Sequence, residues 1–228
     1  MILRTYIITR GLTSIDNLLV DGIGMLKDCG NGWLPTAQTV FECVSSDVVG
    51  LIHDDLTIHD EDWKDRVLKQ FEDEQVAICG FGGASSIGHS DIYKIPYDYT
   101  QLARSGFKSN LVDAESHGER FTGECDVAVL DSFSLFIRRS FLESIGGWPV
   151  DRYAPSHCAD IWVCLKALEQ GMKVRLVGLS CTHTGGGAGA GYHEWAAGTK
   201  WGSDAVMHRV NHRLLYEEFR KVLPVEVK

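Results

Sequence analysis

Two adjacent aspartates stand directly after a short apolar run in this chain. The run is residues 48–52 (Val-Val-Gly-Leu-Ile), and His53, Asp54 and Asp55 follow it. A run of this kind predicts a strand buried on both faces of a parallel sheet, and open α/β sheets bind ligands at the carboxyl ends of such strands. Neighbouring carboxylates repel each other, so a fold that places them together usually supplies a cation or hydrogen-bond donors. The alternative is a strand that runs into an acidic turn.

A later carboxylate and a late histidine could act with this pair. Asp160 lies in the first turn of the helix predicted at residues 160–171, where the macrodipole would lower its pKa and leave a carboxylate able to accept a proton. Helix capping is the alternative role for Asp160. His183 follows a strand predicted at residues 173–179, and by itself it would be interpreted as an ordinary loop histidine. Imidazole and carboxylate ligands together suit Mn²⁺ or Mg²⁺, whereas tetrahedral zinc would require more Cys or His nearby.

Alternating strand and helix patterns must position these residues. The apolar runs and periodicities predict strands at 3–11, 48–52, 76–83, 126–131, 133–137 and 173–179, and helices at 15–23, 33–44, 63–71, 138–145, 160–171 and 195–223. Residues 84–121 form a long polar connection that we assign to specificity. The glycine-rich stretch 185–191 is expected to act as a mobile lid, and the last helix could fold back over the site. This alternation predicts an α/β domain.

Composition sets the outer bounds on function. With 228 residues, 44% of them hydrophobic, the chain can bury one sizeable core, and we expect a single domain. A net charge of -9 gives no general attraction to phosphate backbones or anionic membranes. The seven cysteines include no Cys-x-x-Cys pair, so we interpret them as reduced core residues of a cytoplasmic protein. No apolar run approaches the roughly 18 to 20 residues that span a bilayer.

In order and spacing these residues resemble family-2-like glycosyltransferases of the GT-A fold, particularly compact bacterial and phage-type members. His53-Asp54-Asp55, with Trp63 opening the next helix, is similar to the Asp-x-Asp region of that family. Asp131 and residues 137–148 (Ile-Arg-Arg-Ser-Phe-Leu-Glu-Ser-Ile-Gly-Gly-Trp) are similar to its acceptor-side segment. The start of the helix at 159–162 (Ala-Asp-Ile-Trp) is similar to its Glu-Asp motif, and His183 to its late metal-binding histidine. The resemblance covers roughly residues 47–184.

The resemblance implies a single-domain GT-A-like, Rossmann-type sandwich with a mostly parallel central sheet flanked by helices. Residues 1–83 would bind the nucleotide sugar, 84–184 would form the acceptor and catalytic half, and 185–228 the lid and C-terminal helix. The implied activity is metal-dependent transfer of a sugar, with inversion, from a nucleotide-diphosphate sugar such as a UDP-sugar to an acceptor hydroxyl. The implied roles are Asp160 as catalytic base, Asp55 and His183 as ligands of Mn²⁺ or Mg²⁺, Thr9, Arg10, His53 and Asp54 in donor binding, and Asp131, Trp148 and His157 in acceptor binding.

Three departures keep alternatives open. His53 stands at the first acidic position of the motif, Ala159 replaces the glutamate, and the region before the central strand is shorter than the family usually has. A noncatalytic sugar-nucleotide or glycan-binding protein on the same fold is therefore the main alternative. The acceptor expected from the resemblance is a saccharide or lipid-linked glycan, with a modified base of phage DNA as the other candidate, against which the acidic charge counts.

Three other functions fit the sequence less well. A dinucleotide site at 185–191 lacks the following βαβ unit. A zinc module of His157, Cys158, Cys181 and His183 lacks finger-like spacing. Nucleotidyl transfer would require a better phosphate loop than residues 9–13.

Overall fold

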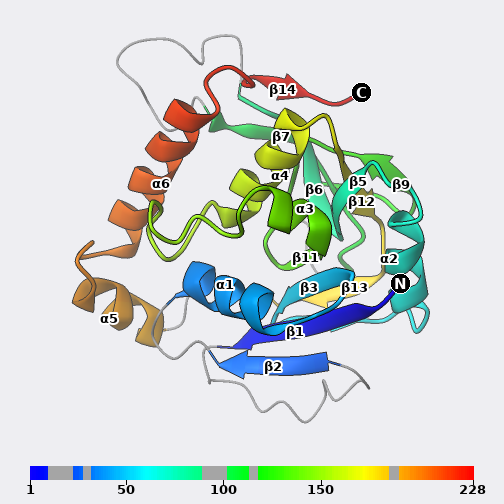
Figure 1. Ribbon diagram of the computed structural model, residues 1–228, viewed down its shortest axis with the longest axis horizontal. Helices are drawn as coiled ribbons and strands as arrows, with labels where there is room; N and C mark the ends of the chain where they lie inside the picture. The colour runs from blue at the N-terminus through cyan, green and yellow to red at the C-terminus, as the bar shows by residue number, and fades with distance from the viewer. Residues whose placement is uncertain (10–22, 28–31, 89–101, 113–117, 185–189) are drawn as a thin grey trace.

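A seven-stranded sheet forms the centre of the molecule, as the computed structural model shows (Figure 1). The structure describes residues 1–9, 23–27, 32–88, 102–112, 118–184 and 190–228. The central sheet has the order β2-β1-β3-β11-β5-β12-β9. Its strands are β1 Leu3–Thr9, β2 Ile23–Lys27, β3 Val48–His53, β5 Val76–Gly80, β9 Glu124–Asp126, β11 Ser134–Arg138 and β12 Lys173–Val177.

Strand β3 is the third strand of this sheet and lies between β1 and β11. Its residues Val48 to Ile52 are buried, which confirms the strand that the apolar run predicts. It pairs in parallel with β1 on one side and antiparallel with β11 on the other. The sheet is therefore mixed: β2, β1 and β3 run in parallel, as do β5 and β12, while β11 and β9 run against their neighbours. The predicted α/β architecture is confirmed.

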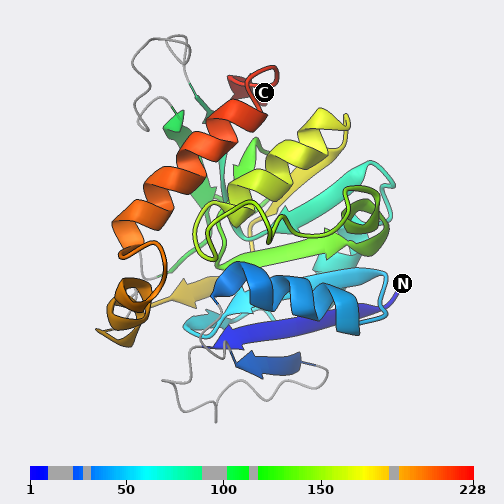
Figure 2. The ribbon, with the colours of Figure 1, turned by 60° about the vertical axis from the view of Figure 1, so that its left-hand side comes forward.

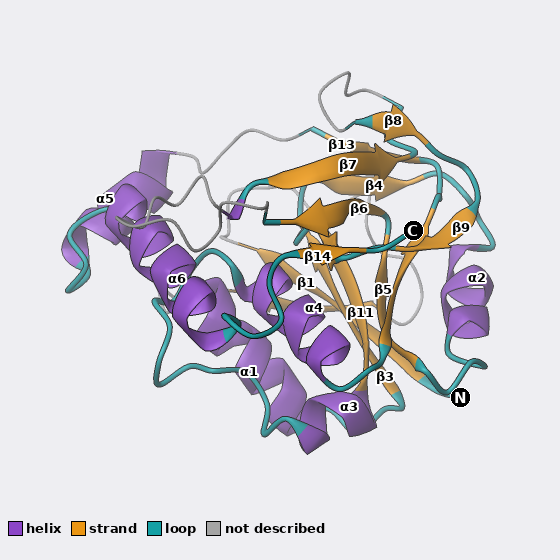
Figure 3. Ribbon diagram, turned by 90° about the horizontal axis from the view of Figure 1, so that it is seen from above, coloured by secondary structure: helices purple, strands orange, loops and turns teal. Residues whose placement is uncertain are grey.

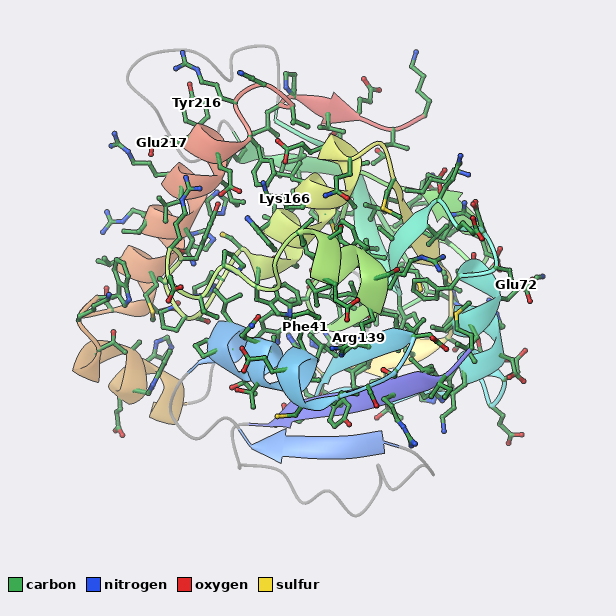
Figure 4. All side chains as sticks on the ribbon, viewed as in Figure 1. Phe41, Glu72, Arg139, Lys166, Tyr216 and Glu217 are labelled. Carbon is green, nitrogen blue, oxygen red and sulfur yellow. The ribbon has the colours of Figure 1, made fainter. Side chains whose placement is uncertain are left out.

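Helices cover both faces of the sheet. The described helices are α1 Trp33–Cys43, α2 Trp63–Gln70, α3 Arg139–Ser144, α4 Ala159–Glu169, α5 Ala190–Gly198 and α6 Asp204–Glu218. Figure 3 shows α1, α3, α4 and α6 on one side of the central strands and α2 on the other. The apolar core is divided in the same way, because side chains of α1, α3 and α4 belong to one buried cluster and Trp63, Val67 and Phe71 to another. Phe41 and Arg139 lie side by side between α1 and α3 (Figure 4), with the guanidinium 4.9 Å from the ring centroid.

Two smaller sheets accompany the central one in the described part of the chain. In one, β10 Val129–Leu130, β6 Gly82–Ile87, β7 Arg104–Ser109 and β8 Glu119–Arg120 lie in that order, and β14 Val225–Glu226 also pairs with β6. In the other, β4 Leu56–Ile58 pairs with β13 Cys181–His183. Among the described residues, no helix combines the length and apolar composition that a bilayer span requires.

Several predicted elements need correction. Gly82 and Gly83 begin β6 rather than closing a turn, and the expected long connection at 84–121 contains most of β6 together with β7 and β8. The single helix expected at 195–223 is two helices, α5 and α6, separated by a turn at Gly202. Ile23, predicted at the end of a helix, begins β2. The rest of that predicted helix, at residues 15–22, lies outside the described residues.

Candidate active site

The carboxyl end of β3 brings His53, Asp55 and His183 together. After His53 the chain turns through Asp54 and Asp55 into β4, and β13 pairs antiparallel with β4 so that His183 lies opposite Leu56. The backbone N–H of Thr184 donates to the carbonyl oxygen of Asp55 at 3.2 Å. This short two-stranded sheet therefore holds a residue from near the end of the chain against the acidic turn, with 3.1 Å between His183 Nε2 and Asp55 Oδ1.

The chemistry of these atoms fits a bound cation. His53 Nδ1 lies 3.9 Å from the same oxygen of Asp55, and one ligand atom from each of the three residues lies within 4.8 Å of the others. Asp55 Oδ1 is buried, with His183 Nε2 at ion-pair distance. A carboxylate oxygen held beside imidazole nitrogens is suited to ligate a cation together with them. Burial raises the pKa of Asp55, but the neighbouring imidazoles of His183 and His53 outweigh it and lower the pKa below its usual value.

Phe133 fixes the position of both histidines, and the sequence analysis missed it. Its ring stacks on the ring of His183 with 4.9 Å between centroids, and its carbonyl oxygen accepts a hydrogen bond from the N–H of His53 at 3.0 Å. Phe133 comes just before β11, which runs antiparallel to β3. The start of β11 therefore lies at the same sheet edge as the end of β3. A residue that precedes an antiparallel strand can thus belong to the same site as residues that follow β3.

Asp160 lies in the first turn of α4 with only 8% of its surface exposed. The expectation that the helix start lowers its pKa is wrong. Burial, which disfavours the charged form, raises the pKa of Asp160, and nearby Asp131 adds to this, while the Arg104 guanidinium and His157 oppose it. The electrostatic interactions show that Asp131 and His157, both predicted on the acceptor side, lie near Asp160.

The segment before Asp160 is held by α6. His157 and Cys158 both have positive φ, 71° and 63°, which is uncommon for residues other than glycine. Asn211 of α6 is fully buried and makes four hydrogen bonds to this segment. It accepts from the N–H of Ala154 and donates to the carbonyl oxygens of Ala154, Ser156 and His157. His157 also hydrogen-bonds to Asp204 at the start of α6.

The remaining predicted site residues are more dispersed. Trp148 is in the core, 4% exposed, with its ring edge-to-face against Trp33 at 5.3 Å. Asp54 occupies the turn between β3 and β4, and Thr9 ends β1. Arg10 and the first five residues of the predicted lid lie outside the described residues. Arg104 and Asn211, which act on or near Asp160, carried no recognisable signal in the sequence.

A solved structure resembles this chain in fold. No protein-family model matches the sequence, and a search of curated proteins gives no match. Among solved structures, A197 from STIV matches 80% of this chain and 85% of its own, with a TM-score of 0.51 and 14% identity. The two chains share a fold. At this identity the likeness is one of fold alone.

Two sugar transferases give somewhat lower scores. The mannosyltransferase PcManGT from Pyrobaculum calidifontis, solved with GDP-Man and Mn²⁺, has a TM-score of 0.49 and 12% identity over 94% of this chain and 69% of its own. GalNAc-T7, solved with UDP, GalNAc and Mn²⁺, has a TM-score of 0.49 and 11% identity over 71% of this chain, which spans only 32% of that structure.

Proposed function

We propose that this protein is a metal-dependent glycosyltransferase that moves a sugar, with inversion, from a nucleotide-diphosphate sugar to an acceptor hydroxyl. The observation that carries the proposal is the approach of His183 to Asp55 at the carboxyl end of β3, with 3.1 Å between their ligand atoms. This is the edge where α/β sheets bind ligands. The sequence resemblance to family-2-like glycosyltransferases assigns metal binding to the same two residues.

Asp55 and His183 would hold the cation, and their oxygen and imidazole ligands suit Mn²⁺ or Mg²⁺. A cation bound there supplies positive charge that stabilises the departing diphosphate. The protein's own part is to hold the two ligands. The pairing of β13 with β4 sets the backbone of His183, and the Phe133 ring sets its imidazole. Asp54, in the same turn, would contact the ribose or a cation-bound water, and Thr9 and Arg10 would contact the donor.

Asp160 would act as the general base. Its carboxylate takes the proton of the acceptor hydroxyl while that oxygen forms a bond to the anomeric carbon. The bond from this carbon to the diphosphate oxygen breaks on the opposite face, so the configuration is inverted. Asp131 and His157, which act electrostatically on Asp160, would bind the acceptor. Arg104 also acts on Asp160 and favours its charged form, which is the form that a base requires.

The direct test is donor binding and donor breakdown with and without Mn²⁺. Nucleotide sugars should raise the melting temperature only when Mn²⁺ is present, because a ligand that binds the folded chain stabilises it. Asp55→Asn should abolish this Mn²⁺-dependent shift. Asp73→Asn is the matched control, since Asp73 precedes β5 at the opposite edge of the sheet and pairs with Lys173 at 2.8 Å. Equal shifts in wild type and Asp55→Asn would refute the proposed metal site.

A noncatalytic sugar-nucleotide-binding protein is the second candidate, and one observation favours it. Ala159 stands at the start of α4 where the resemblance has a glutamate, and an alanine supplies neither charge nor hydrogen bond. Release of free nucleotide from the donor distinguishes the two functions. Mn²⁺-dependent binding with no nucleotide release, tested with saccharide acceptors present, would support the binding protein and exclude the transferase.

A further inference from the structure

A second group of potential metal ligands lies between the start of α4 and the middle of α6. Cys158 immediately precedes α4, and His208 and His212 lie on α6. One ligand atom from each of these residues lies within 4.8 Å of the other two. Cys158 and His212 are buried and His208 is partly buried. Figures 1 and 2 both show α6 running beside α4. Lys166 of α4 (Figure 4) forms an ion pair with Glu218 of α6, with 2.9 Å between Nζ and Oε1.

The spacing of the two histidines is suited to binding one ion. Residues four apart on an α-helix share a face, and the His208 and His212 rings have centroids 4.3 Å apart. A thiolate and two imidazoles are ligands of zinc, and zinc sites with three protein groups complete their tetrahedral shell with a water. Hard cations such as Mg²⁺ prefer oxygen. We propose that Cys158, His208 and His212 form a zinc site that joins the start of α4 to α6.

The protonation of the cluster is compatible with this proposal. Burial lowers the pKa of His212 to about 4 and also lowers that of His208, so both rings are neutral at pH 7, the form that binds a metal. Burial raises the pKa of the Cys158 thiol, so zinc displaces the thiol proton when the Zn–S bond forms, and one proton is released to solvent. The bound ion and thiolate together carry one positive charge.

Charged groups of both signs lie around the cluster. Asp160 interacts with Cys158, and Asp204 interacts with His208; both carboxylates favour a positive ion. Arg104 acts on all three members of the cluster and opposes a cation, and His157 acts on both histidines in the same direction as Arg104. His157, whose ring lies 5.2 Å from that of His208, is hydrogen-bonded to Asp204.

The backbone at Cys158 is consistent with a functional constraint. Its φ of 63°, following the 71° of His157, is a conformation that L-residues adopt rarely, and such conformations cluster at functional sites. The Cys158 side chain makes no capping hydrogen bond to α4, so helix capping does not account for this backbone conformation. The proposed ion would fix the start of the helix that carries Asp160. The proposed zinc site does not depend on the proposed transferase activity.

Cobalt spectroscopy of the full chain tests the site, using protein made without a polyhistidine tag and stripped with a chelator. Co²⁺ should give a sulfur-to-cobalt charge-transfer band and the intense d–d absorption of tetrahedral cobalt, at one thiolate-bound ion per chain. Zn²⁺ should abolish both signals. Co²⁺ held by Asp55 and His183 would give no thiolate band, so the two sites are distinguishable. Absence of the band in folded wild-type protein overturns the proposal.

Variants then assign the ligands. Cys158→Ser should abolish the charge-transfer band, and His208→Ala or His212→Ala should weaken Co²⁺ binding about 100-fold or more, since even partners of metal ligands are worth 10- to 100-fold. Cys43→Ser is the control, because Cys43 is exposed at the end of α1, and it should retain the band. Asp55→Asn should retain it too. A band that persists in Cys158→Ser, or unchanged Co²⁺ affinity in both histidine variants, would contradict the assignment even if one variant folds poorly.

Discussion

Asn211 should be among the polar side chains on which the stability of this fold depends most. It is completely buried in α6 and makes four hydrogen bonds to residues 154–157, the segment that leads into α4. A net contribution of about 0.5 to 1.5 kcal/mol for each bond predicts that Asn211→Ala lowers the free energy of unfolding by about 2 to 6 kcal/mol. The loss includes a buried N–H at Ala154 that is left without its acceptor.

Asn211→Asp makes the test sharper because the two side chains have nearly the same size. The carboxylate keeps an acceptor for the N–H of Ala154 but turns an oxygen toward the carbonyl oxygens of Ala154, Ser156 and His157. We therefore expect Asn211→Asp to be at least as destabilising as Asn211→Ala at pH 7, because a buried charge without donors adds to the lost bonds.

Urea unfolding followed by tryptophan fluorescence measures these differences. The control on the same helix is Arg213→Ala, which removes an exposed ion pair with Glu217 and should change the free energy of unfolding by about 0.5 kcal/mol or less. If Asn211→Ala lies as close to wild type as Arg213→Ala does, the hydrogen bonds of Asn211 do not hold the segment. An Asn211→Asp variant more stable than Asn211→Ala at pH 7 would also refute the reasoning.

Three further outcomes are expected. Glu218, 12% exposed, has a pKa below 4.5 through its hydrogen bonds despite burial, so Glu218→Gln should lower the free energy of unfolding by about 2 to 4 kcal/mol at pH 7. The stabilisation by ionised Glu218 is present above pH 4.5 and is lost as the pH falls further. A difference in unfolding free energy between wild type and Glu218→Gln that stays the same at every pH in urea titrations would contradict this. Asp160→Asn should slow single-turnover sugar transfer about 10² to 10⁴-fold with unchanged donor affinity; wild-type turnover would exclude the base role. Gly50→Ala places a Cβ 2.8 Å from the Phe136 ring and 2.9 Å from Thr5 Oγ1. This overpacking should lower the free energy of unfolding by about 1 to 3 kcal/mol and lower the melting temperature with it. An unchanged melting temperature would show that β3 shifts to make room for the methyl group.

Strong local patterns account for the elements that the sequence predicted correctly. The apolar run of β3 is buried, and the stop of α3 at Gly146 and Gly147 is explained by their positive φ of 83°. The segment Gly-Gly-Ala-Ser-Ser-Ile, which forms β6, has little of the composition typical of strands. Its pairing with β7, β10 and β14 makes it a strand, and these partners are distant in sequence.

The candidate site was predictable only where a residue's position along its own strand or helix decides its role. His53 and Asp55 follow from the end of β3, whereas His183 came from the family resemblance. Asn211 acts on a segment more than 50 residues earlier in the chain, and only the packing of α6 shows this. The direction of the Asp160 pKa shift also depended on tertiary structure, since burial outweighs the helix terminus.

The stack of Phe133 on His183 determines when conformational entropy is lost. The imidazole is 12% exposed, and its ring lies against the fully buried Phe133 ring and within 3.1 Å of Asp55. Its rotamer freedom is thus given up when the chain folds, and little remains to be lost when a ligand binds. A preorganised pair cannot adapt its spacing to ions of different radius. If the proposed metal site binds a cation, its discrimination among divalent cations should therefore follow ionic size.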